Sequence, residues 1–485
     1  MNFTKKLFTF LIIASTFAIV GCGDDAACDG KQCLDTQLLD AATCDCIDIN
    51  TIPCDGVTCD EGEVLDAATC ECVDLGSGNP TTETLAGEIK SDKTLSADRI
   101  YLLQGKTYVV PGVTLTIEPG VIVKGVEGTG SLASALVITR GAKIEACGTA
   151  DNPIIFTSEL DNIKLGDLSG TNLSQTDREL WGGLIVLGNA PISAKDGDTE
   201  TQIEGIPGDV SYGKYGGADA DDNSGSLCYL SIRHGGALIG DDNEINGLTL
   251  GGVGNGTTVN NIEVVANLDD GIEFFGGTVD VTNALVAYQG DDAIDIDMNY
   301  SGTIDNVYII HGGDDTDEAF EIDGPENSTY TEGKFTILNA TAIAEDMEKT
   351  SGADLKSKAQ GLLKGISWEG YSAARAVAVR ATFDTSNDCA DKADSYLNTL
   401  SNDLVIMECE YVSDAATVND LARVYIDNKA DDAEELQSCL DATDYQEVLD
   451  GIISNMDNKV SSASTLGAVR SEFSWTWAAS KNLVK

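Results

Sequence analysis

The chain has 485 residues, of which 42% are apolar, so it can bury a large core, and a wholly disordered protein is excluded. Its 81 acidic residues against 29 Lys and Arg give a net charge of −52, which repels phosphate backbones and argues against a nucleic-acid-binding protein. With two histidines, a zinc centre built from several histidines is also excluded. The 51 Gly and 8 Pro favour a β protein with many tight turns.

Residues 1–21 are typical of a secretory signal peptide. Two lysines precede an apolar run over residues 7–20 that is too short to span a bilayer. The sequence Ile19-Val20-Gly21-Cys22 resembles a bacterial lipobox, which implies acylation of Cys22 and a lipid anchor in the outer membrane. Asp24 and Asp25 resemble the acidic tags that carry Bacteroidota lipoproteins to the cell exterior. The alternative is an ordinary cleaved signal followed by an incidental cysteine.

Residues 22–75 contain an internal duplication. The pattern C-x4-C-x10-C-x-C occurs twice, with an offset of 26 residues. A unit this small buries too little apolar surface to fold unaided, and export exposes it to an oxidising environment, so we expect two disulfides in each repeat. Two pairings remain open in each repeat, and thiolate zinc sites are the alternative. The cysteines concerned are Cys28, Cys33, Cys44, Cys46, Cys54, Cys59, Cys70 and Cys72. We interpret the pair as a stalk, with residues 76–84 as a linker.

Residues 85–345 show short β-branched runs separated by glycine, which is typical of strands joined by tight turns. The motif Val259-x-Asn261 recurs as Val281-x-Asn283 and Ile304-x-Asn306, at spacings of 22 and 23 residues. A constant period with several short strands predicts a parallel β-helix, in which equivalent residues of successive turns stack ~4.8 Å apart.

Five segments of this region also resemble a family of Bacteroidota surface lipoproteins. They are LTIEPGVIVKG (115–125), ADNPIIFTS (150–158), WGGLIVLGNAPI (181–192), SIRHGGALIGDDNEINGLTLGGVG (231–254) and NLDDGIEFFGG (267–277). The resemblance resumes near residues 473–477, and it implies a right-handed parallel β-helix on the cell surface. It implies no established activity.

Acidic residues recur in successive turns of the predicted helix. Two carboxylates ~4.8 Å apart repel by about 3 kcal/mol at an effective dielectric of about 20, and a bound cation would relieve this repulsion. We therefore expect structural Ca²⁺, which accepts many oxygen ligands; solvated turn acids are the alternative. The expected ligands are Asp269, Asp270, Asp291, Asp292, Asp295, Asp314 and Asp315, with Asp297, Asp317, Glu321 and Asp323 nearby. The loop with Asp219, Asp221 and Asn223 is a weaker candidate, for which Asx turns are the simpler interpretation.

The order Asn267-Leu-Asp269, Asp291-Asp292 and His311 is similar to that of polygalacturonase-type β-helix hydrolases. The resemblance implies that Asp292 would act as the acid, with Asp269 and Asp291 activating water. However, no Arg-x-Lys follows on the next turn, and a packed turn histidine is the alternative for His311. The sequence therefore favours a protein that is not an enzyme.

Residues 346–470 carry apolar side chains at three- and four-residue spacing, notably over 388–407 and 432–460, which predicts an α-rich insertion or cap. Residues 471–485 are expected to form a closing strand, with Phe473, Trp475 and Trp477 in the core rather than exposed for sugar stacking. Cys147 and Cys228 are expected to be buried singly.

Taken together, the sequence predicts a lipoprotein on the cell exterior, made of a stalk, a β-helix body supported by Ca²⁺ and a helical cap. The expected role is binding or display, with an extracellular polysaccharide or another cell's surface as the partner. The alternatives are a structural component of the envelope coat and a β-helix polysaccharide hydrolase or lyase.

Overall fold

The computed structural model describes residues 37–39, 46–48, 63–66, 71–74, 81–239, 244–312, 316–326, 328–345, 351–371, 375–384, 390–391, 395–415, 417–427 and 457–485. Its contacts divide the chain into two units, Met1–Asn79 and Pro80–Lys485, which are described one at a time.

The first unit repeats one small antiparallel ribbon. Strand β1 (Gln37–Leu39) pairs with β2 (Cys46–Asp48), and β3 (Glu63–Asp66) pairs with β4 (Glu71–Asp74). Gln37 opposes Asp48 in the first ribbon, and Glu63 opposes Asp74 in the second, so the registers agree at the offset of 26 found in the sequence. The predicted disulfides and the predicted acylation at Cys22 involve cysteines that, apart from Cys46 and Cys72, lie outside the described residues.

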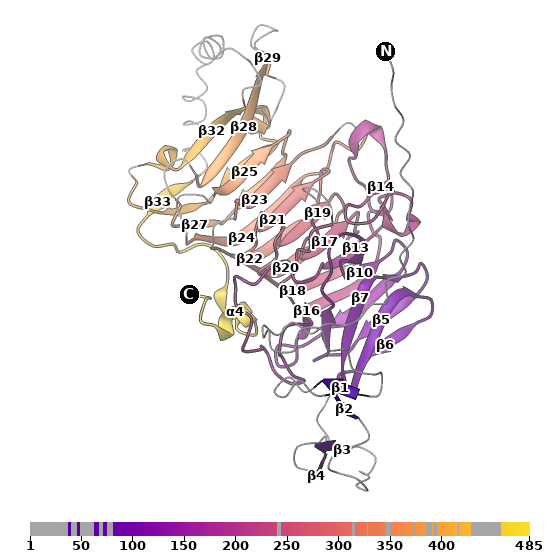
Figure 1. The fold of residues 1–485 in the computed structure, drawn as a ribbon. Coiled ribbons are helices and arrows are strands. Elements are labelled where there is room, and N and C mark those ends of the chain that lie inside the picture. Colours follow the sequence, from indigo (N-terminus) through magenta and orange to yellow (C-terminus); the bar gives the residue numbers. More distant parts are fainter. Residues whose placement is uncertain are drawn as a thin grey trace, which may run out of the picture. The chain divides into compact units, whose positions relative to one another are not determined.

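The second unit is a coil of short parallel strands, and most strands pair with the strand one turn earlier and the strand one turn later (Figure 1). The first ladder consists of the second halves of β5 (Thr81–Ile89) and β7 (Arg99–Val109), then β10 (Ala135–Ile138), β13 (Leu184–Leu187), β17 (Leu248–Gly251), β19 (Ile272–Phe275), β21 (Ile294–Asp297), β23 (Glu318–Asp323), β25 (Ser351–Lys356), β28 (Val377–Asp384) and β32 (Ala422–Asp427). The second ladder consists of β6 (Lys93–Leu95), β8 (Thr114–Ile117), β11 (Lys143–Cys147), the first halves of β16 (Gly225–Arg233), β18 (Thr258–Val265), β20 (Val281–Ala287), β22 (Thr303–His311) and β24 (Phe335–Ala344), then β26 (Gly361–Lys364) and β30 (Leu404–Met407). The third ladder consists of the first halves of β5 and β7, then β9 (Ile122–Gly125), β12 (Ile154–Ser158), the second halves of β16, β18, β20, β22 and β24, then β27 (Ser367–Glu369), β31 (Glu410–Val412) and β33 (Lys459–Ser461).

The expected fold class, a mainly β protein built as a right-handed parallel β-helix, is confirmed. Alternation along each strand sends every second side chain inward, so that Ile272 and Phe274 join one continuous apolar core while Glu273 faces outward. The coil begins at Thr81, inside the range that the sequence assigned to a linker.

Asparagines form the corner between the second and third ladders. Asn261, Asn283 and Asn306 have φ of 54°, 59° and 63°, the left-handed conformation that Asn tolerates better than other non-glycine residues. Asn283 Nδ2 donates to Asn261 Oδ1 at 3.1 Å, and Asn306 Nδ2 donates to Asn283 Oδ1 at 2.5 Å. The repeated Val-x-Asn motif thus marks a turn that is stabilised from one rung to the next.

The structure differs from the sequence expectation over residues 346–470. Strands β25 to β28 and β30 to β33 continue the coil in the described parts of this range, whereas β29 (Ala390–Asp391) pairs antiparallel with the end of β28. The one α-helix among the described residues of this range is α1 (Ser395–Ser401), which lies inside the first segment expected to be helical. In the segment expected to be helical, Leu404 and Ile406 of β30 are buried with strand alternation. Residues 428–456, which include most of the second expected helix, lie outside the described residues.

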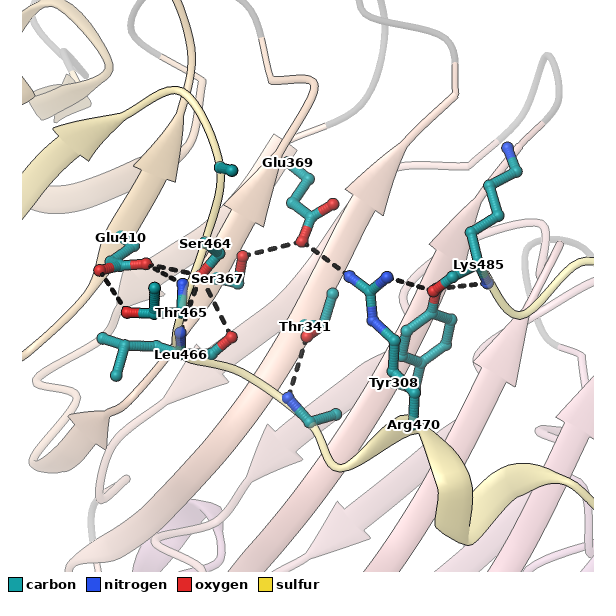
Figure 2. Close-up of polar contacts among 12 residues, drawn as sticks. Tyr308, Thr341, Ser367, Glu369, Glu410, Ser464, Thr465, Leu466, Arg470 and Lys485 are labelled. Atoms are coloured by element: carbon teal, nitrogen blue, oxygen red, sulfur yellow. Dashed lines mark hydrogen bonds and ion pairs between the residues drawn. The ribbon is translucent and has the colours of Figure 1, made fainter.

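The C-terminal segment, residues 462–485, does not form the expected closing strand. It runs back along the third ladder, and Figure 2 shows its contacts with successive strands: Ser464 Oγ donates to Glu410 at 2.9 Å, and Arg470 Nη2 donates to Glu369 at 3.1 Å. It ends in a short helix, α4 (Trp477–Ser480). Phe473 and Trp477 are buried on the outer face of β18, β20 and β22, in a cluster separate from the main core.

The cysteines of the body also differ from the expectation. Cys147 and Cys228 are register partners on β11 and β16 and form a disulfide, so the expectation that each is buried singly was wrong. Parallel stacking places equal ladder positions side by side, which brings together two cysteines 81 residues apart in the chain. Cys409 is a buried free cysteine.

An acidic cleft as the candidate functional site

A column of carboxylates runs along the outer face of the first ladder. Glu273, Asp295, Glu321 and Asp354 are successive register partners on β19, β21, β23 and β25. Each lies between two residues that point into the core, for example Ile294 and Ile296 on either side of Asp295. The strand alternation that forms the core therefore also forces the four acids onto one face.

A second column lies at the start of the same strands. The backbone N–H of Asp292 donates to Asp270 Oδ1 at 2.9 Å, and the backbone N–H of Glu318 donates to Asp292 Oδ1 at 2.6 Å. Each carboxylate thus receives a hydrogen bond from the next rung. These bonds hold the side chains of Asp270 and Asp292 in place, with 6% and 4% of their surface exposed.

The two columns border a cavity of about 510 Å³. It is lined by Glu204, Glu244, Leu268, Asp269, Asp270, Glu273, Gly290, Asp291, Asp292, Asp295 and Glu321. Nine of these eleven residues are Asp or Glu, so the cavity concentrates negative charge rather than apolar surface, and we call it the acidic cleft.

In and beside the acidic cleft, carboxylate oxygens converge in three groups, and the oxygens of each group all lie within 4.8 Å of one another. The groups are Asp269, Asp270 and Asp291; Asp270, Glu273 and Asp295; and Asp292, Glu318 and Glu321. In the second group, Asp295 is only 7% exposed, and its buried Oδ1 atom has no hydrogen-bond partner. A buried carboxylate oxygen without a partner is costly, and a cation would satisfy it.

Burial, followed by repulsion from neighbouring carboxylates, raises the pKa values across the acidic cleft. The pKa of Asp291 is raised to about 6 and that of Asp269 to about 7. At Glu318 the pKa is raised to about 8, and at Asp270 and Asp295, which are more deeply buried, the pKa is raised well above the ordinary value. Near neutral pH the acidic cleft therefore holds protons that a metal ion could displace.

Basic residues neutralise one end of the column. Lys356 on β25 forms ion pairs with Glu321 and with Asp323, the latter at 3.4 Å. Arg380 Nε on β28 donates to both oxygens of Asp354 at 2.9 and 2.7 Å. In the described part of the chain, Asp270, Glu273 and Asp295 have no such ion pair, so the carboxyl groups without a basic partner are concentrated at β19 and β21.

The structure brings five of the seven predicted metal ligands to the acidic cleft: Asp269, Asp270, Asp291, Asp292 and Asp295. Asp314 and Asp315 lie outside the described residues. Sequence reasoning missed Glu273 and Glu318, although Glu273 precedes Asp295 by the same 22 residues that separate Asp270 from Asp292. It also missed Glu204 and Glu244, which come from loops and carry no periodic signal.

The structure brings together only part of the residue set that resembles the active site of polygalacturonase-type hydrolases. Asp269, Asp291 and Asp292 line the acidic cleft, but His311 is fully buried and is not among the lining residues. The His311 ring packs edge-on against Tyr371, and burial lowers its pKa to about 3. His311 is therefore a neutral packed histidine, in line with the simpler alternative.

The weaker metal candidate is organised by local turns. The backbone N–H of Asp221 donates to Asp219 Oδ1 at 3.2 Å, and that of Gly225 donates to Asn223 Oδ1 at 2.9 Å. Lys143 Nζ also donates to Asn223 Oδ1, at 3.2 Å. Two-residue hydrogen bonds of this kind are Asx turns, and a nearby lysine opposes a cation.

The sequence model of a family described as a pectate-lyase-like β-helix domain matches residues 87–443. No curated protein and no solved structure matches the chain. Within the part of the chain that the structure describes, none of the helices combines the length and apolar character needed to cross a membrane.

Proposed function

The chain belongs to the family of pectate-lyase-like β-helix domains, and from this membership and the acidic cleft we propose that it binds an extracellular polysaccharide through divalent cations. The observation that carries the proposal is the convergence of carboxylate oxygens into three groups in and beside one solvent-accessible cavity, together with the buried Oδ1 atom of Asp295, which has no hydrogen-bond partner.

The donor set fits a hard cation. Every candidate ligand is a carboxylate oxygen, which Ca²⁺ prefers, and Ca²⁺ tolerates the irregular geometry that three side chains from adjacent rungs supply. Asp270, Glu273 and Asp295 would hold the more buried ion, and Asp269 with Asp291 would hold an ion nearer the mouth. Bound Ca²⁺ would supply positive charge that offsets the repulsion between the carboxylates.

The overall charge suggests how a polymer would bind. A protein with a net charge of −52 repels acidic polysaccharides unless a cation bridges the two partners. An ion held at the mouth by Asp269 and Asp291 keeps open coordination positions for a sugar carboxylate. The ladder repeats along the coil at ~4.8 Å, so a chain molecule lying along it would meet similar groups at regular intervals. The polymer we favour is therefore acidic.

We also propose that the protein works outside the cell. The signal peptide over residues 1–21, acylation of Cys22 and the acidic residues that follow would anchor it on the outer membrane, facing the exterior, with the two N-terminal repeats as a stalk. The Cys147–Cys228 disulfide supports this location, because such bonds persist in oxidising compartments.

Cleavage of the same polymer is the second candidate, and the family match favours keeping it. Asp269 and Asp291 lie at the mouth of the acidic cleft with pKa values of about 7 and about 6, which suit groups that exchange protons near neutral pH. His311 takes no part in this candidate. A structural component of the envelope coat is the third candidate, and it needs no ligand.

The test is a binding and cleavage assay of the mature protein against polygalacturonate, alginate and a neutral glucan, each with 2 mM CaCl₂ or with EDTA. We expect acidic polymers to bind in Ca²⁺ and not in EDTA, with Asp291→Asn weakening the binding and the exposed Glu145→Gln as a matched control. Release of reducing or unsaturated ends would favour the enzyme. Equal binding in EDTA, or no binding of any acidic polymer, would contradict the proposal.

A further inference from the structure

One wall of the acidic cleft is a loop rather than a strand. Residues 191–216, here called the covering loop, fold over the outer face of the first ladder and contain a short hairpin of β14 (Thr201–Gln202) and β15 (Lys214–Tyr215). Ile192, Ile203 and Tyr215 of this loop pack on Ile185 and Phe275 of the strands beneath. Apolar packing thus holds the covering loop over β13 and over β19, the strand that carries Glu273 of the acidic cleft.

Glu204 extends from the covering loop into the acidic cleft. Asn246 Nδ2 donates to Glu204 Oε1 at 3.1 Å and also to Glu273 Oε2, so one amide bridges a loop carboxylate and a strand carboxylate. Burial raises the pKa of Glu204, and the charge of Glu204 helps to raise the pKa of Glu273. When both carboxylates are ionised, they repel each other and push the covering loop away from β19.

Two buried oxygens at this place lack partners. Asn246 is fully buried and its Oδ1 atom has no hydrogen-bond partner, and the same holds for Oδ1 of Asp295, the register partner of Glu273. Rotating the side-chain amide of Asn by 180° about its last side-chain bond exchanges the positions of its oxygen and its nitrogen. That rotation would aim a neutral oxygen at the carboxylates of Glu204 and Glu273, which is the kind of ligand set that Ca²⁺ takes.

We propose that Glu204, Glu273 and Asn246 form a further divalent-cation subsite that ties the covering loop to the sheet. The inference rests on the cation binding proposed above and goes beyond it, because it makes the wall of the acidic cleft itself depend on the cation. With the ion bound, attraction replaces the repulsion between Glu204 and Glu273, and the covering loop is held down. Without the ion, the apolar contacts, the hydrogen bond from Asn246 to Glu204 and the ion pair of Glu200 with Arg140 hold the loop against this repulsion.

Hydrogen–deuterium exchange with mass analysis tests this on the mature full chain, in 2 mM CaCl₂ and in EDTA, alongside calorimetry with CaCl₂. In the wild type, we expect Ca²⁺ to slow exchange of peptides from residues 191–216. In Glu204→Gln, we expect this slowing to be lost and the number of bound ions to fall by one. Glu200→Gln is the matched control, since Glu200 is an exposed acid of the same loop that pairs with Arg140 outside the acidic cleft.

The outcomes separate the two proposals. If calorimetry detects no Ca²⁺ binding to the wild type, both the proposed function and this inference fail. If Ca²⁺ binds but exchange in the covering loop does not change, or if Glu204→Gln responds as the wild type does, this inference alone is overturned. A response lost in Glu200→Gln as well as in Glu204→Gln would also overturn it, because the effect would then belong to the loop's charge rather than to the subsite.

Discussion

Replacing Asp295 by Asn should make the protein more stable than the wild type without cations and less stable than the wild type with Ca²⁺. The Asp295 carboxylate lies within 4.8 Å of a carboxylate oxygen of Asp270 and of one of Glu273. At that distance two full charges repel by about 3 kcal/mol at an effective dielectric of about 20. The amide keeps the shape of the side chain and removes the charge. In EDTA at pH 8 we therefore expect Asp295→Asn to melt at a higher temperature than the wild type.

In Ca²⁺ the order should invert, because the variant lacks one anionic ligand. Thermal melts followed by circular dichroism in EDTA and in 2 mM CaCl₂ measure both effects, with Glu145→Gln on the exposed face of β11 as the control. A variant that is less stable than the wild type in EDTA at every pH would refute the repulsion argument. A variant that Ca²⁺ stabilises as much as the wild type would refute the ligand role of Asp295.

The same comparison has a defined pH dependence. The folded-state pKa values are raised, from 3.8 to about 7 at Asp269 and from 4.5 to about 8 at Glu318, so the folded protein holds protons that the unfolded chain releases above pH 4 to 5. Without cations, the stability of the wild type should therefore fall as pH rises from about 4 to about 8. The gap between Asp295→Asn and the wild type in EDTA should widen over this window. If the difference in stability between the variant and the wild type did not change with pH, these carboxyl groups would not titrate between about pH 4 and pH 8.

Three further predictions concern the frame of the coil. Asn283 has φ of 59°, so Asn283→Ala should lower the free energy of unfolding by about 1–2 kcal/mol more than Asn283→Gly does in urea titrations; equal losses would argue against backbone strain. Glu263 accepts the backbone N–H of Trp477 at 3.0 Å, so Glu263→Ala should make the C-terminal segment more sensitive to carboxypeptidase, and unchanged digestion would show that packing alone holds it. In protein isolated without reductant, Cys147 and Cys228 should resist alkylation under denaturing conditions until reductant is added, and labelling of either beforehand would contradict the disulfide.

Much of the frame was predictable because a coil repeats its local rules. The Val-x-Asn motif fixed the corner between two strands, and Asp270 and Asp292 were correctly expected to stack, since equal offsets mean equal positions while the turn length is constant. The next described member of that column is Glu318, and the expected Asp314 and Asp315 lie outside the described residues. The loop before β23 is longer, so this turn adds 26 residues rather than 22 between register partners Ile294 and Phe320. Strand pairing tolerates a longer loop, whereas a constant offset of 22 residues assigns the wrong ladder position after such a loop.

Among the described residues of 346–470, the helical expectation holds only at α1 and was wrong at the strands, for a related reason. Apolar residues at three- and four-residue spacing also arise where short alternating strands are interrupted by turns, as at Leu404 and Ile406. The pairing of β30 with β26 decides between the two structures, and this pairing is a contact between distant parts of the chain.

The sequence by itself determined the acidic character, the duplicated N-terminal unit and the repeating turn, because composition and short periods are properties of neighbouring residues. Stacking alone decided that Cys147 meets Cys228 and that Glu273 stands above Asp295. The folding of a distant loop decided that Glu204 lies near Glu273. The path of the C-terminal segment back along the third ladder decided which side chains cover β18, β20 and β22. These contacts join residues tens to hundreds of positions apart, and loop lengths, which the periodic pattern does not constrain, set which side chains meet.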